Sequence, residues 1–249
     1  MKSALTILSF FFLASSAQAD DSVSAKAIIK SAIDNYRGVN SYSEATMTIH
    51  RPEWERVMSM KAWTEGLDKS LVRITAPKKD KNNGTLLIDN NMWSYSPKIN
   101  RVIKIPSSMS NQSWMGSDFS NNDIARADDL IDKYTHSIVE TSEKNGITQY
   151  IIQSVPHEDA PVVWGKELLT IDSRYIVHKH EFYDQDNKLI KTMTGSDTKL
   201  IDDKYVSLRQ RMQKSDKPDE WTEFETQTIK FNIPMKENTF TLYRLQNPR

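Results

Sequence analysis

Apolar and polar residues alternate along most of this chain, but the first regular stretch has a different period. Between Ser22 and Arg37 the apolar side chains recur at helical spacing, and Gly38 follows the last of them. This pattern predicts one amphipathic helix that is capped by Ser22 or Ser24 and buries one face. From residue 43 onward the period changes to two, which is typical of β-strands buried on one side.

Segments with the strand pattern continue almost to the end of the chain, and most are joined by short turns. Short connections favour a meander, so we expect neighbouring segments to pair as antiparallel strands. We predict one sheet of roughly ten or eleven strands, which must curl to remain a single sheet. The segments cover residues 43–50, 55–64, 69–76, 85–89, 92–96, 101–105, 136–141, 147–155, 166–172, 176–183, 188–194, 205–214 and 221–233.

The alternation stops between residues 106 and 122. This segment keeps Met109, Trp114, Met115 and Phe119 among serines and asparagines, and a loop of this length is usually functional or disordered. We interpret it as an apolar flap that covers a hydrophobic site. A short helix is predicted after it, over residues 123–133.

The chain shows no low-complexity linker and no fixed-period repeat, so we expect one domain after the N-terminal segment. Residues 1–19 have the pattern of a cleaved secretion signal, with Lys2, a short apolar core and Ala17-Gln18-Ala19 as the cleavage site. Cleavage would leave residues 20–249 as the mature domain in an extracytoplasmic compartment. The chain contains no cysteine, so disulfides and thiol nucleophiles are excluded and no cysteine can carry a lipid anchor.

Charge is balanced, with 33 basic and 33 acidic side chains. A nucleic-acid-binding protein needs a net basic face, and the one basic run, Lys78 to Lys81, is interrupted by Asp80. After the signal no apolar run reaches the length that spans a membrane. We therefore expect neither nucleic acid as a partner nor a transmembrane segment.

Signals of catalysis are weak in this sequence. The seven glycines are far apart, so no phosphate-binding loop or dinucleotide fingerprint can be written. The nucleophile elbow of hydrolases and the His-Glu-x-x-His zinc motif are also missing. We expect a protein that is not an enzyme and has no catalytic residue and no cofactor.

Two clusters of chemically active side chains still need an interpretation. His178 and His180 face the same side of a predicted strand and could bind a metal, but no third ligand is at firm spacing, so we interpret them as part of a solvated face. Glu220, Glu223 and Glu225 could include a catalytic carboxylate pair, but alternating acids more often form the hydrated side of a strand. We therefore predict no metal site.

One set of motifs connects these segments to a known family. Together they resemble the LolA-like branch of the outer-membrane lipoprotein-sorting proteins, and the similarity extends over most of the mature chain. The motif centred on Gly116-Ser117-Asp118-Phe119 is the most specific of them. The set comprises Pro77, Gly84-Thr85, Trp93-Ser94-Tyr95-Ser96-Pro97, Arg101-Val102, Trp114-Met115-Gly116-Ser117-Asp118-Phe119-Ser120 and Asp123.

The resemblance implies a mainly β (α+β) fold. In it, one strongly curved antiparallel sheet forms an incomplete barrel around one to three helices and encloses an apolar cavity. On this basis Trp114, Met115 and Phe119 would form the lid, and Arg101 and Asp118 would form a polar latch at its mouth. The residues expected to line the cavity are Met58, Met60, Val72, Ile74, Leu86, Ile88, Trp93 and Tyr95.

The resemblance further implies a periplasmic carrier or chaperone of a Gram-negative bacterium that binds the acyl chains of lipids or lipoproteins and passes them between membranes or membrane complexes. An inner-membrane transporter or exporter would be a possible partner, and contact with the membrane would be transient. The alternative is a non-enzymatic docking or sensor module in which the Trp114 region binds an envelope complex. A hydrolase would require His178 or His180 to meet a serine at the cavity wall.

Overall fold

The computed structural model describes residues 24–125, 129–160 and 162–248 of the chain. Its helices are α1 (Ala25–Arg37), α2 (Asn121–Ala125), α3 (Asp129–Asp132) and α4 (Leu242–Gln246), with one 3-10 turn at Ser107–Met109. Its strands are β1 (Asn40–Arg51), β2 (Trp54–Glu65), β3 (Lys69–Ala76), β4 (Gly84–Ile88), β5 (Asn91–Ser96), β6 (Arg101–Ile105), β7 (Tyr134–Lys144), β8 (Ile147–Pro156), β9 (Lys166–Asp172), β10 (Val177–Tyr183), β11 (Leu189–Ile201), β12 (Lys204–Lys214) and β13 (Trp221–Phe231).

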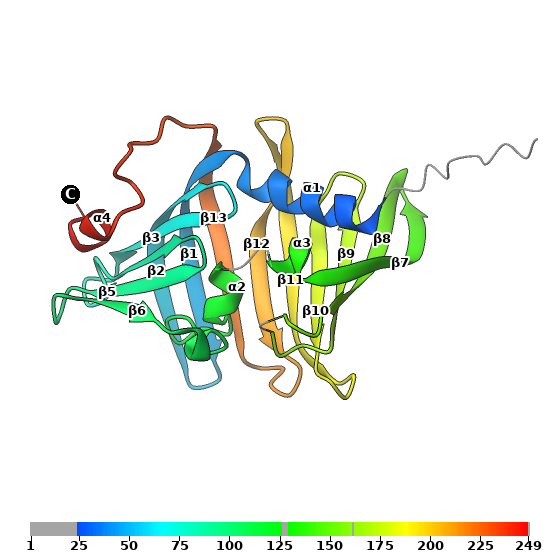
Figure 1. Cartoon of the computed structure of the whole chain (residues 1–249), viewed down its shortest axis with the longest axis horizontal. Helices are drawn as coiled ribbons and strands as arrows, with labels where there is room; N and C mark the ends of the chain where they lie inside the picture. Colours follow the sequence, from blue (N-terminus) through cyan, green and yellow to red (C-terminus); the bar gives the residue numbers. More distant parts are fainter. Residues whose placement is uncertain (1–23, 126–128, 161, 249) are drawn as a thin grey trace, which may run out of the picture.

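All of these strands belong to one antiparallel sheet that curls but does not close. Its order is β6-β5-β4-β3-β2-β1-β13-β12-β11-β10-β9-β8-β7. Every pair of adjacent strands is also consecutive along the chain except β1 and β13, and the consecutive strands β6 and β7 form the two edges of the sheet. That junction joins an N-terminal and a C-terminal meander into a single half-barrel. Helices α1, α2 and α3 lie on its concave face (Figure 1).

Helix α1 forms as the sequence predicts. Ser24 occupies the N-cap, and Gly38, at a φ of 63°, ends the helix by donating its backbone N–H to Asp34 O at 2.8 Å. The buried face packs against α3, β8 and β9 through one apolar cluster. Its buried members are Ala25, Ile28, Ile29, Ala32, Ile131, Ile152, Leu169 and Ile171.

A second core fills the concave face of the other half of the sheet, and Trp114 from the flap belongs to it. The remaining buried members are Met47, Ile49, Met58, Met60, Ile74, Leu87 and Met92. Methionine is unbranched and polarizable, so it fills the irregular gaps under the flap better than a branched side chain. The space between the two cores lies over the central strands of the sheet.

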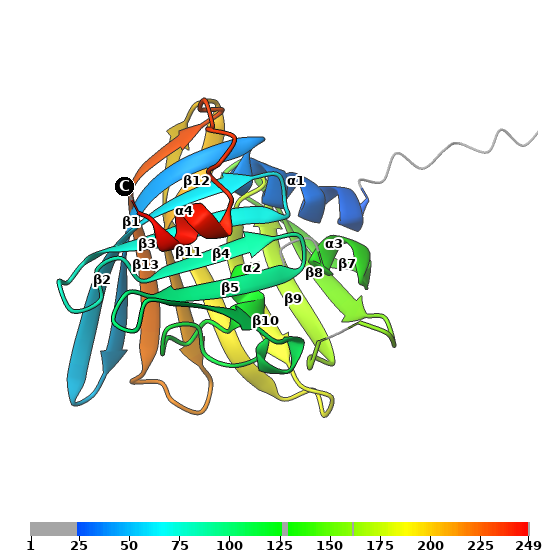
Figure 2. The ribbon, with the colours of Figure 1, turned by 60° about the vertical axis from the view of Figure 1, so that its left-hand side comes forward.

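A third core lies on the convex face, where α4 crosses β3 and β4 (Figure 2). Leu245 is fully buried there against Leu71, Leu86 and Tyr95. Arg73 donates to the backbone carbonyls of Arg244 and Leu245 at 2.9 and 2.5 Å, which satisfies the end of this short helix. Burial lowers the pKa of Arg73 to about 10, with a smaller contribution from the charge of Arg244.

The prediction of a single curled antiparallel sheet with few helices is confirmed. The sheet has 13 strands, more than the ten or eleven expected, although every segment with the strand pattern contributes a strand. The helix expected over residues 123–133 is two short helices, α2 ending at Ala125 and α3 beginning at Asp129. Helix α4 was not predicted, and the signal at residues 1–19 lies outside the described residues.

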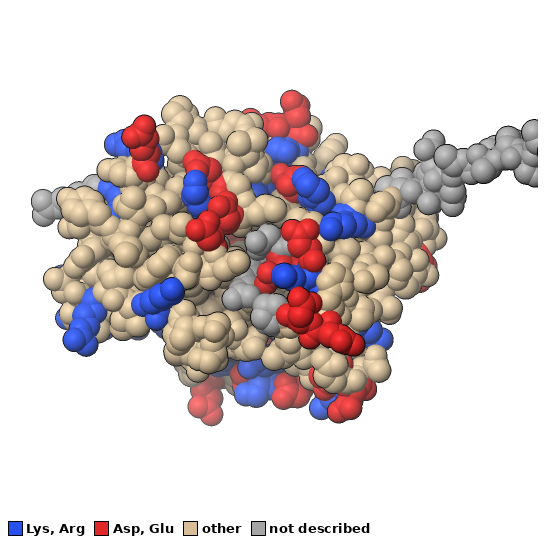
Figure 3. Space-filling model, in the orientation of Figure 1, with Lys and Arg blue, Asp and Glu red and all other residues tan. Residues whose placement is uncertain are grey.

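Acidic and basic side chains are interspersed on the concave side, with broad uncharged areas between them (Figure 3). In the parts of the chain that the structure describes, no helix is both long enough and apolar enough to cross a membrane.

Candidate functional site: a cavity beneath an anchored flap

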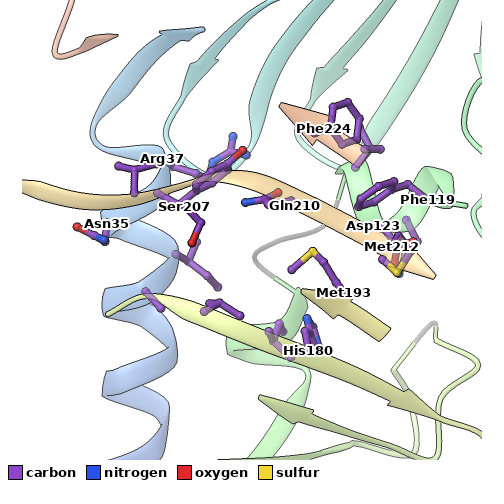
Figure 4. A pocket seen from close by; sticks show the side chains of 18 of the residues that line it. Asn35, Arg37, Phe119, Asp123, His180, Met193, Ser207, Gln210, Met212 and Phe224 are labelled. Atoms are coloured by element: carbon purple, nitrogen blue, oxygen red, sulfur yellow. The ribbon is translucent and has the colours of Figure 1, made fainter. Parts of the chain in front are cut away.

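A cavity of about 380 Å³ lies between the two concave cores, bounded by α1, the central strands and the flap. This volume is in the range of pockets that bind small molecules. Its wall is mostly apolar, and Figure 4 shows Phe119, Met212 and Phe224 together on one side. The other apolar side chains in the wall are Ala32, Ile33, Ala45, Met60, Ala62, Val72, Trp114, Ile124, Leu130, Val162, Trp164, Ile176, Val177, Phe182, Met193 and Val206.

The residues predicted to line the cavity divide between the two faces of the sheet. Met60 and Val72 contribute to the cavity wall. Met58 and Ile74 share their face but are buried in the core next to the cavity. The prediction for Leu86, Ile88, Trp93 and Tyr95 was wrong, because these four side chains lie on the convex face and pack with Leu245 in the third core.

The register between β3 and β4 explains this error. Val72, which points inward, pairs with Thr85, and Thr85 in turn pairs with Ser94. In β4 and β5 the residues that face inward are therefore the chain neighbours of the four predicted ones, such as Thr85 and Ser94. Alternation shows which residues of one strand share a face, but it does not show how two strands are aligned.

The flap is part of the folded core. Trp114 and Phe119 are only 3% and 4% exposed, and both line the cavity. The indole N–H of Trp114 donates to Thr85 Oγ1 at 3.1 Å, and the ring of Phe119 packs edge-on against Phe224 at 5.0 Å between centroids. Met115 is half-buried and packs against the second core. Because Trp114 is buried, the docking hypothesis loses the exposed surface that it assigned to this region.

The predicted latch between Asp118 and Arg101 was wrong. Asp118 has a fully buried side chain, and both of its carboxylate oxygens accept hydrogen bonds from Arg51 at 3.0 Å. Thr222 donates to the same carboxylate at 2.7 Å, and the backbone N–H of Asp118 donates to Thr222 Oγ1 at 3.0 Å. Arg101 is exposed on the edge strand β6. The acid therefore anchors the flap to β1 and β13 at a site that is far from Arg101 in the sheet order.

The remaining residues of the motif shape the turn that carries Asp118. Met115 and Gly116 adopt positive φ values of 52° and 79°, and glycine enters this region at little cost. Ser117 donates its hydroxyl to Trp114 O at 2.7 Å. At the start of α2, Ser120 and Asp123 cap each other's backbone N–H groups at 3.1 and 2.7 Å. The motif is thus a turn that is held on one side by Trp114 in the second core and on the other by the bonds of Asp118 to Arg51 and Thr222.

Two polar clusters interrupt the apolar wall, and each is internally satisfied. Tyr134 O–H and His180 Nε2 both bond to the buried carboxylate of Glu167 at 2.5 Å. Burial and the adjacent Glu167 carboxylate raise the pKa of Tyr134, so the phenol stays protonated. Lys191 donates to Asp123 at 2.5 Å and lies over the ring of Phe182 at 4.6 Å. These clusters close the wall without leaving an unpaired charge.

The two histidines considered as metal ligands contact different acids. His180 bonds to Glu167, whereas His178 bonds to Asp172 at 3.0 Å. Residues 24–125, 129–160 and 162–248 contain no group of three or more His, Asp or Glu side chains that could hold a metal. Neither histidine has a serine among the hydrogen-bond partners given by the described residues, which is the contact that the hydrolase hypothesis requires.

Asp172 stabilises the turn between β9 and β10 next to the cavity. Burial alone would raise its pKa, but hydrogen bonds from His178, from Arg174 and from the backbone N–H groups of Arg174 and Ile176 lower it to about 2. The folded-state pKa therefore lies below the value of 3.8 for a free Asp. This difference corresponds to about 2 kcal/mol of stability that is present above pH 4 and is lost as the pH falls toward 2.

Asp172→Asn should therefore lower the free energy of unfolding by about 2 kcal/mol at pH 7. The difference between the wild type and the variant should shrink between pH 4 and pH 2, because the unfolded wild-type chain takes up a proton on Asp172 in this range while the folded chain keeps the carboxylate ionised down to about pH 2. Urea unfolding at several pH values measures both effects. A difference that stays constant down to pH 2 would contradict this role for Asp172.

The two acids of β13 that were considered as a carboxylate pair, and Glu220 just before the strand, are engaged in ion pairs. Glu223 pairs with Arg209 and Arg211 at 3.1 and 2.9 Å, and Glu225 pairs with Arg209 at 2.8 Å. Glu220 pairs with Arg51 at 3.2 Å. None of the three appears in the cavity wall. They balance neighbouring arginines and do not form a carboxylate pair at the cavity.

One antiparallel sheet that curls without closing is a fold that this chain shares with solved structures of other proteins. A domain described as an outer membrane lipoprotein-sorting protein domain from Vibrio parahaemolyticus has 23% sequence identity and a TM-score of 0.79, and the match covers 89% of this chain and 98% of that one. A DUF1329 family protein from Desulfovibrio piger has 22% identity and a TM-score of 0.81, with coverage of 89% and 97%. A LolA superfamily protein from Nitrosomonas europaea has 20% identity and a TM-score of 0.72, with coverage of 88% and 98%.

A family model described only as that of an uncharacterized protein matches residues 66–247. The chain belongs to this family, and its fold is that of the LolA-like proteins that the sequence motifs resemble. No curated protein sequence matches the chain.

Proposed function

We propose that this protein is a non-enzymatic periplasmic carrier that binds acyl chains of lipids or lipoproteins in the cavity and passes them between membranes or membrane complexes. The observation that supports this most directly is the apolar cavity of about 380 Å³ under the flap. Two structural relatives, which are described as an outer-membrane lipoprotein-sorting domain and a LolA superfamily protein, agree with it. The working domain in this proposal is residues 20–249 after cleavage of the signal.

The energetics suit transfer in both directions. Each buried methylene contributes about 0.8 kcal/mol, so one acyl chain provides on the order of 10 kcal/mol relative to water. A bilayer solvates the chain equally well, which cancels most of this gain when the chain leaves a membrane. Small changes in the flap or contact with a membrane transporter or exporter can then set the direction of transfer.

The experiment that tests the proposal is organic extraction and mass spectrometry of the mature protein purified gently from its own periplasm. We expect an acyl-containing species at about one equivalent per chain. Protein without lipid that also fails to bind a fluorescent fatty acid would overturn the carrier proposal. The docking or sensor function would then be favoured.

Filling the cavity should remove its capacity for lipid. Ala62 faces the cavity from β2 and pairs with Ser43 and Val72 on either side. Ala62→Phe places a ring in the space that an acyl chain would use, so we expect at least a tenfold loss of affinity for a fluorescent fatty acid, equivalent to about 1.4 kcal/mol.

The matched control is Val57→Phe. Val57 lies on the opposite face of the same strand and is 45% exposed, so its replacement should leave fatty-acid affinity unchanged. Equal affinities in Ala62→Phe and Val57→Phe would show that the ligand binds elsewhere.

A further inference from the structure

The cavity meets solvent at one end of its wall. Among the described residues that line it, the three most exposed are all tyrosines: Tyr36, Tyr175 and Tyr205, at 44%, 42% and 37%. Phe119 of the flap is only 4% exposed. Figure 4 shows it well apart from Asn35, the chain neighbour of Tyr36. The exposed part of the wall therefore lies away from the flap, and we call these three residues the tyrosine mouth.

The three tyrosines come from separate elements that contact one another. Tyr36 is in the last turn of α1, Tyr175 is in the turn between β9 and β10, and Tyr205 is near the start of β12. The side-chain amide of Asn35 donates to Tyr205 O at 2.6 Å, and the guanidinium of Arg174 lies 4.9 Å from the centre of the Tyr205 ring. The chain neighbours of Tyr36 and Tyr175 thus both contact Tyr205, so the three residues form one rim.

Tyr175 is held in place by the turn that carries it. Its φ of 64° is one that residues other than glycine seldom adopt. The backbone N–H of Tyr175 donates to Asp172 O at 2.8 Å, and the carboxylate of Asp172 accepts from the backbone N–H groups of Arg174 and Ile176 at 2.9 and 3.2 Å. The fold thus fixes a partly exposed aromatic ring at the edge of the cavity, in a conformation that points to a functional constraint.

Apolar side chains continue the mouth onto the outer surface. Leu200 is 59% exposed and pairs with Tyr205 across β11 and β12, and directly paired residues point to the same face of a sheet. Val39, which follows Gly38 at the end of α1, is 75% exposed. The hairpin of β11 and β12 stands beside this end of α1 (Figure 1). The mouth is therefore bordered by apolar groups that face solvent.

The chemistry of this rim fits the surface of a lipid bilayer. Tyrosine combines an apolar ring with a polar hydroxyl, and it is enriched where proteins meet the interface between membrane and water. Asp202 and Asp203 in the turn of the hairpin are matched in number by Lys199 and Lys204 beside them, so the contact should not depend on charge. An acyl chain that crossed open water would expose its methylenes, which a mouth placed against the bilayer avoids.

We propose that acyl chains enter and leave the cavity through the tyrosine mouth while the flap stays closed, and that the mouth rests on the surface of a lipid bilayer during this exchange. The proposal rests on the carrier function and specifies the route of its cargo. A route through the flap would require the buried pair of Arg51 and Asp118 to break at each passage. The mouth needs no such change.

The route is tested by placing one bulky group at each entrance. The chain contains no cysteine, so a single introduced cysteine can be modified with a polyethylene glycol maleimide at that position alone. Leu200→Cys carries the polymer beside the mouth, Gln112→Cys carries it on the exposed surface of the flap, and Val57→Cys carries it on the convex face. Stopped-flow fluorescence measures the association rate of a fluorescent fatty acid with each delipidated protein.

We expect the polymer on Leu200→Cys to slow association about tenfold relative to the polymer on Val57→Cys, whereas the polymer on Gln112→Cys should not slow it. Each unmodified variant controls for the substitution itself. Slower association with the polymer on Gln112→Cys, and not on Leu200→Cys, would overturn the mouth as the route.

Contact with the bilayer is tested by transfer of the bound fluorescent fatty acid to vesicles of dioleoyl phosphatidylcholine. Transfer during contact makes the rate rise with vesicle concentration, whereas transfer through water gives a rate that is set by dissociation alone. We expect a rate that rises with vesicle concentration and changes little between about 0.1 and 0.5 M NaCl, since the charges of the hairpin are balanced. A rate that is independent of vesicle concentration would overturn the bilayer contact and favour a protein partner at the mouth.

Leu200→Ser tests the apolar border of the mouth. It should lower the vesicle-dependent rate about three- to tenfold, because it removes apolar surface from the contact. Leu200 is absent from the cavity wall, so the equilibrium affinity for the fatty acid should stay the same. Val139→Ser is the matched control, since Val139 is 53% exposed on the edge strand β7. Equal transfer rates in the two variants would contradict contact through this border.

The outcomes separate this proposal from the one on which it rests. If the wild-type protein binds the fluorescent fatty acid but the polymer beside the mouth has no effect, the route is wrong and the carrier function stands. If the wild-type protein binds no fatty acid, the carrier function itself is overturned.

Discussion

Asp118→Ala should lower the free energy of unfolding by about 3 kcal/mol. Removal of one partner from a buried ion pair typically costs about 3–5 kcal/mol, because the other charge stays buried without compensation. We expect the lower end of this range, because Arg51 keeps its contact with Glu220 at 3.2 Å. Urea unfolding of the delipidated protein measures the loss.

The control for this variant is Glu225→Ala. Glu225 pairs with Arg209 at 2.8 Å, but the two side chains are 45% and 40% exposed, and exposed pairs contribute about 0–1 kcal/mol. If Asp118→Ala cost no more than the control, the flap would not depend on this anchor. A large loss would show that the Gly-Ser-Asp-Phe motif acts through stability.

Trp114→Ala should cost about 3–5 kcal/mol, the usual range for truncation of a buried aromatic side chain. Trp114 packs with Met47, Met58 and Met92 in the second core and also closes the cavity. The substitution should therefore reduce stability and fatty-acid retention together. Serine at positions 114 and 119 would likewise weaken the fold, so those variants cannot isolate the role of the lid.

Trp114→Phe is the control that separates packing from hydrogen bonding. It keeps an aromatic ring in the core but loses the indole N–H donated to Thr85 at 3.1 Å, so we expect a loss of about 1 kcal/mol. Thermal unfolding and fatty-acid retention should be measured on both variants. If Trp114→Ala lost less than about 1 kcal/mol, the flap would be a mobile cover and not part of the core.

These predictions change the picture of the flap that the sequence suggests. A long loop with apolar residues is compatible with a lid that swings freely, but Trp114, Phe119 and Asp118 all hold this loop against the sheet. A ligand therefore enters the cavity either after the buried ion pair between Arg51 and Asp118 breaks, or by a route that leaves the flap in place. Helix α1 forms the opposite side of the cavity.

The candidate site was only partly predictable from the sequence. Met60, Val72, Trp114 and Phe119 were expected at the cavity and are found there. Ser207 in the cavity wall was missed, because it is an ordinary serine on an alternating strand and its unpaired hydroxyl exists only in the folded chain. The positive φ of 52° at Asp197 on the adjacent strand β11 is a local irregularity that alternation alone does not predict.

The sequence by itself determined the strands, helix α1 and the fold class. The period of two marked every strand, Gly38 marked the end of α1, and the short turns required antiparallel neighbours. These are local properties, since they depend on side-chain spacing and on the dihedral preferences of single residues.

The tertiary structure alone decided which faces and which partners meet. The pairing of β1 with β13 joins residues almost two hundred positions apart, and the register of β3 with β4 sends Leu86 to the convex face. Asp118 pairs with Arg51 and not with Arg101, because the curled sheet carries the flap across the concave face to β1 and β13. Such contacts depend on the alignment of distant strands, for which spacing along one strand carries no information.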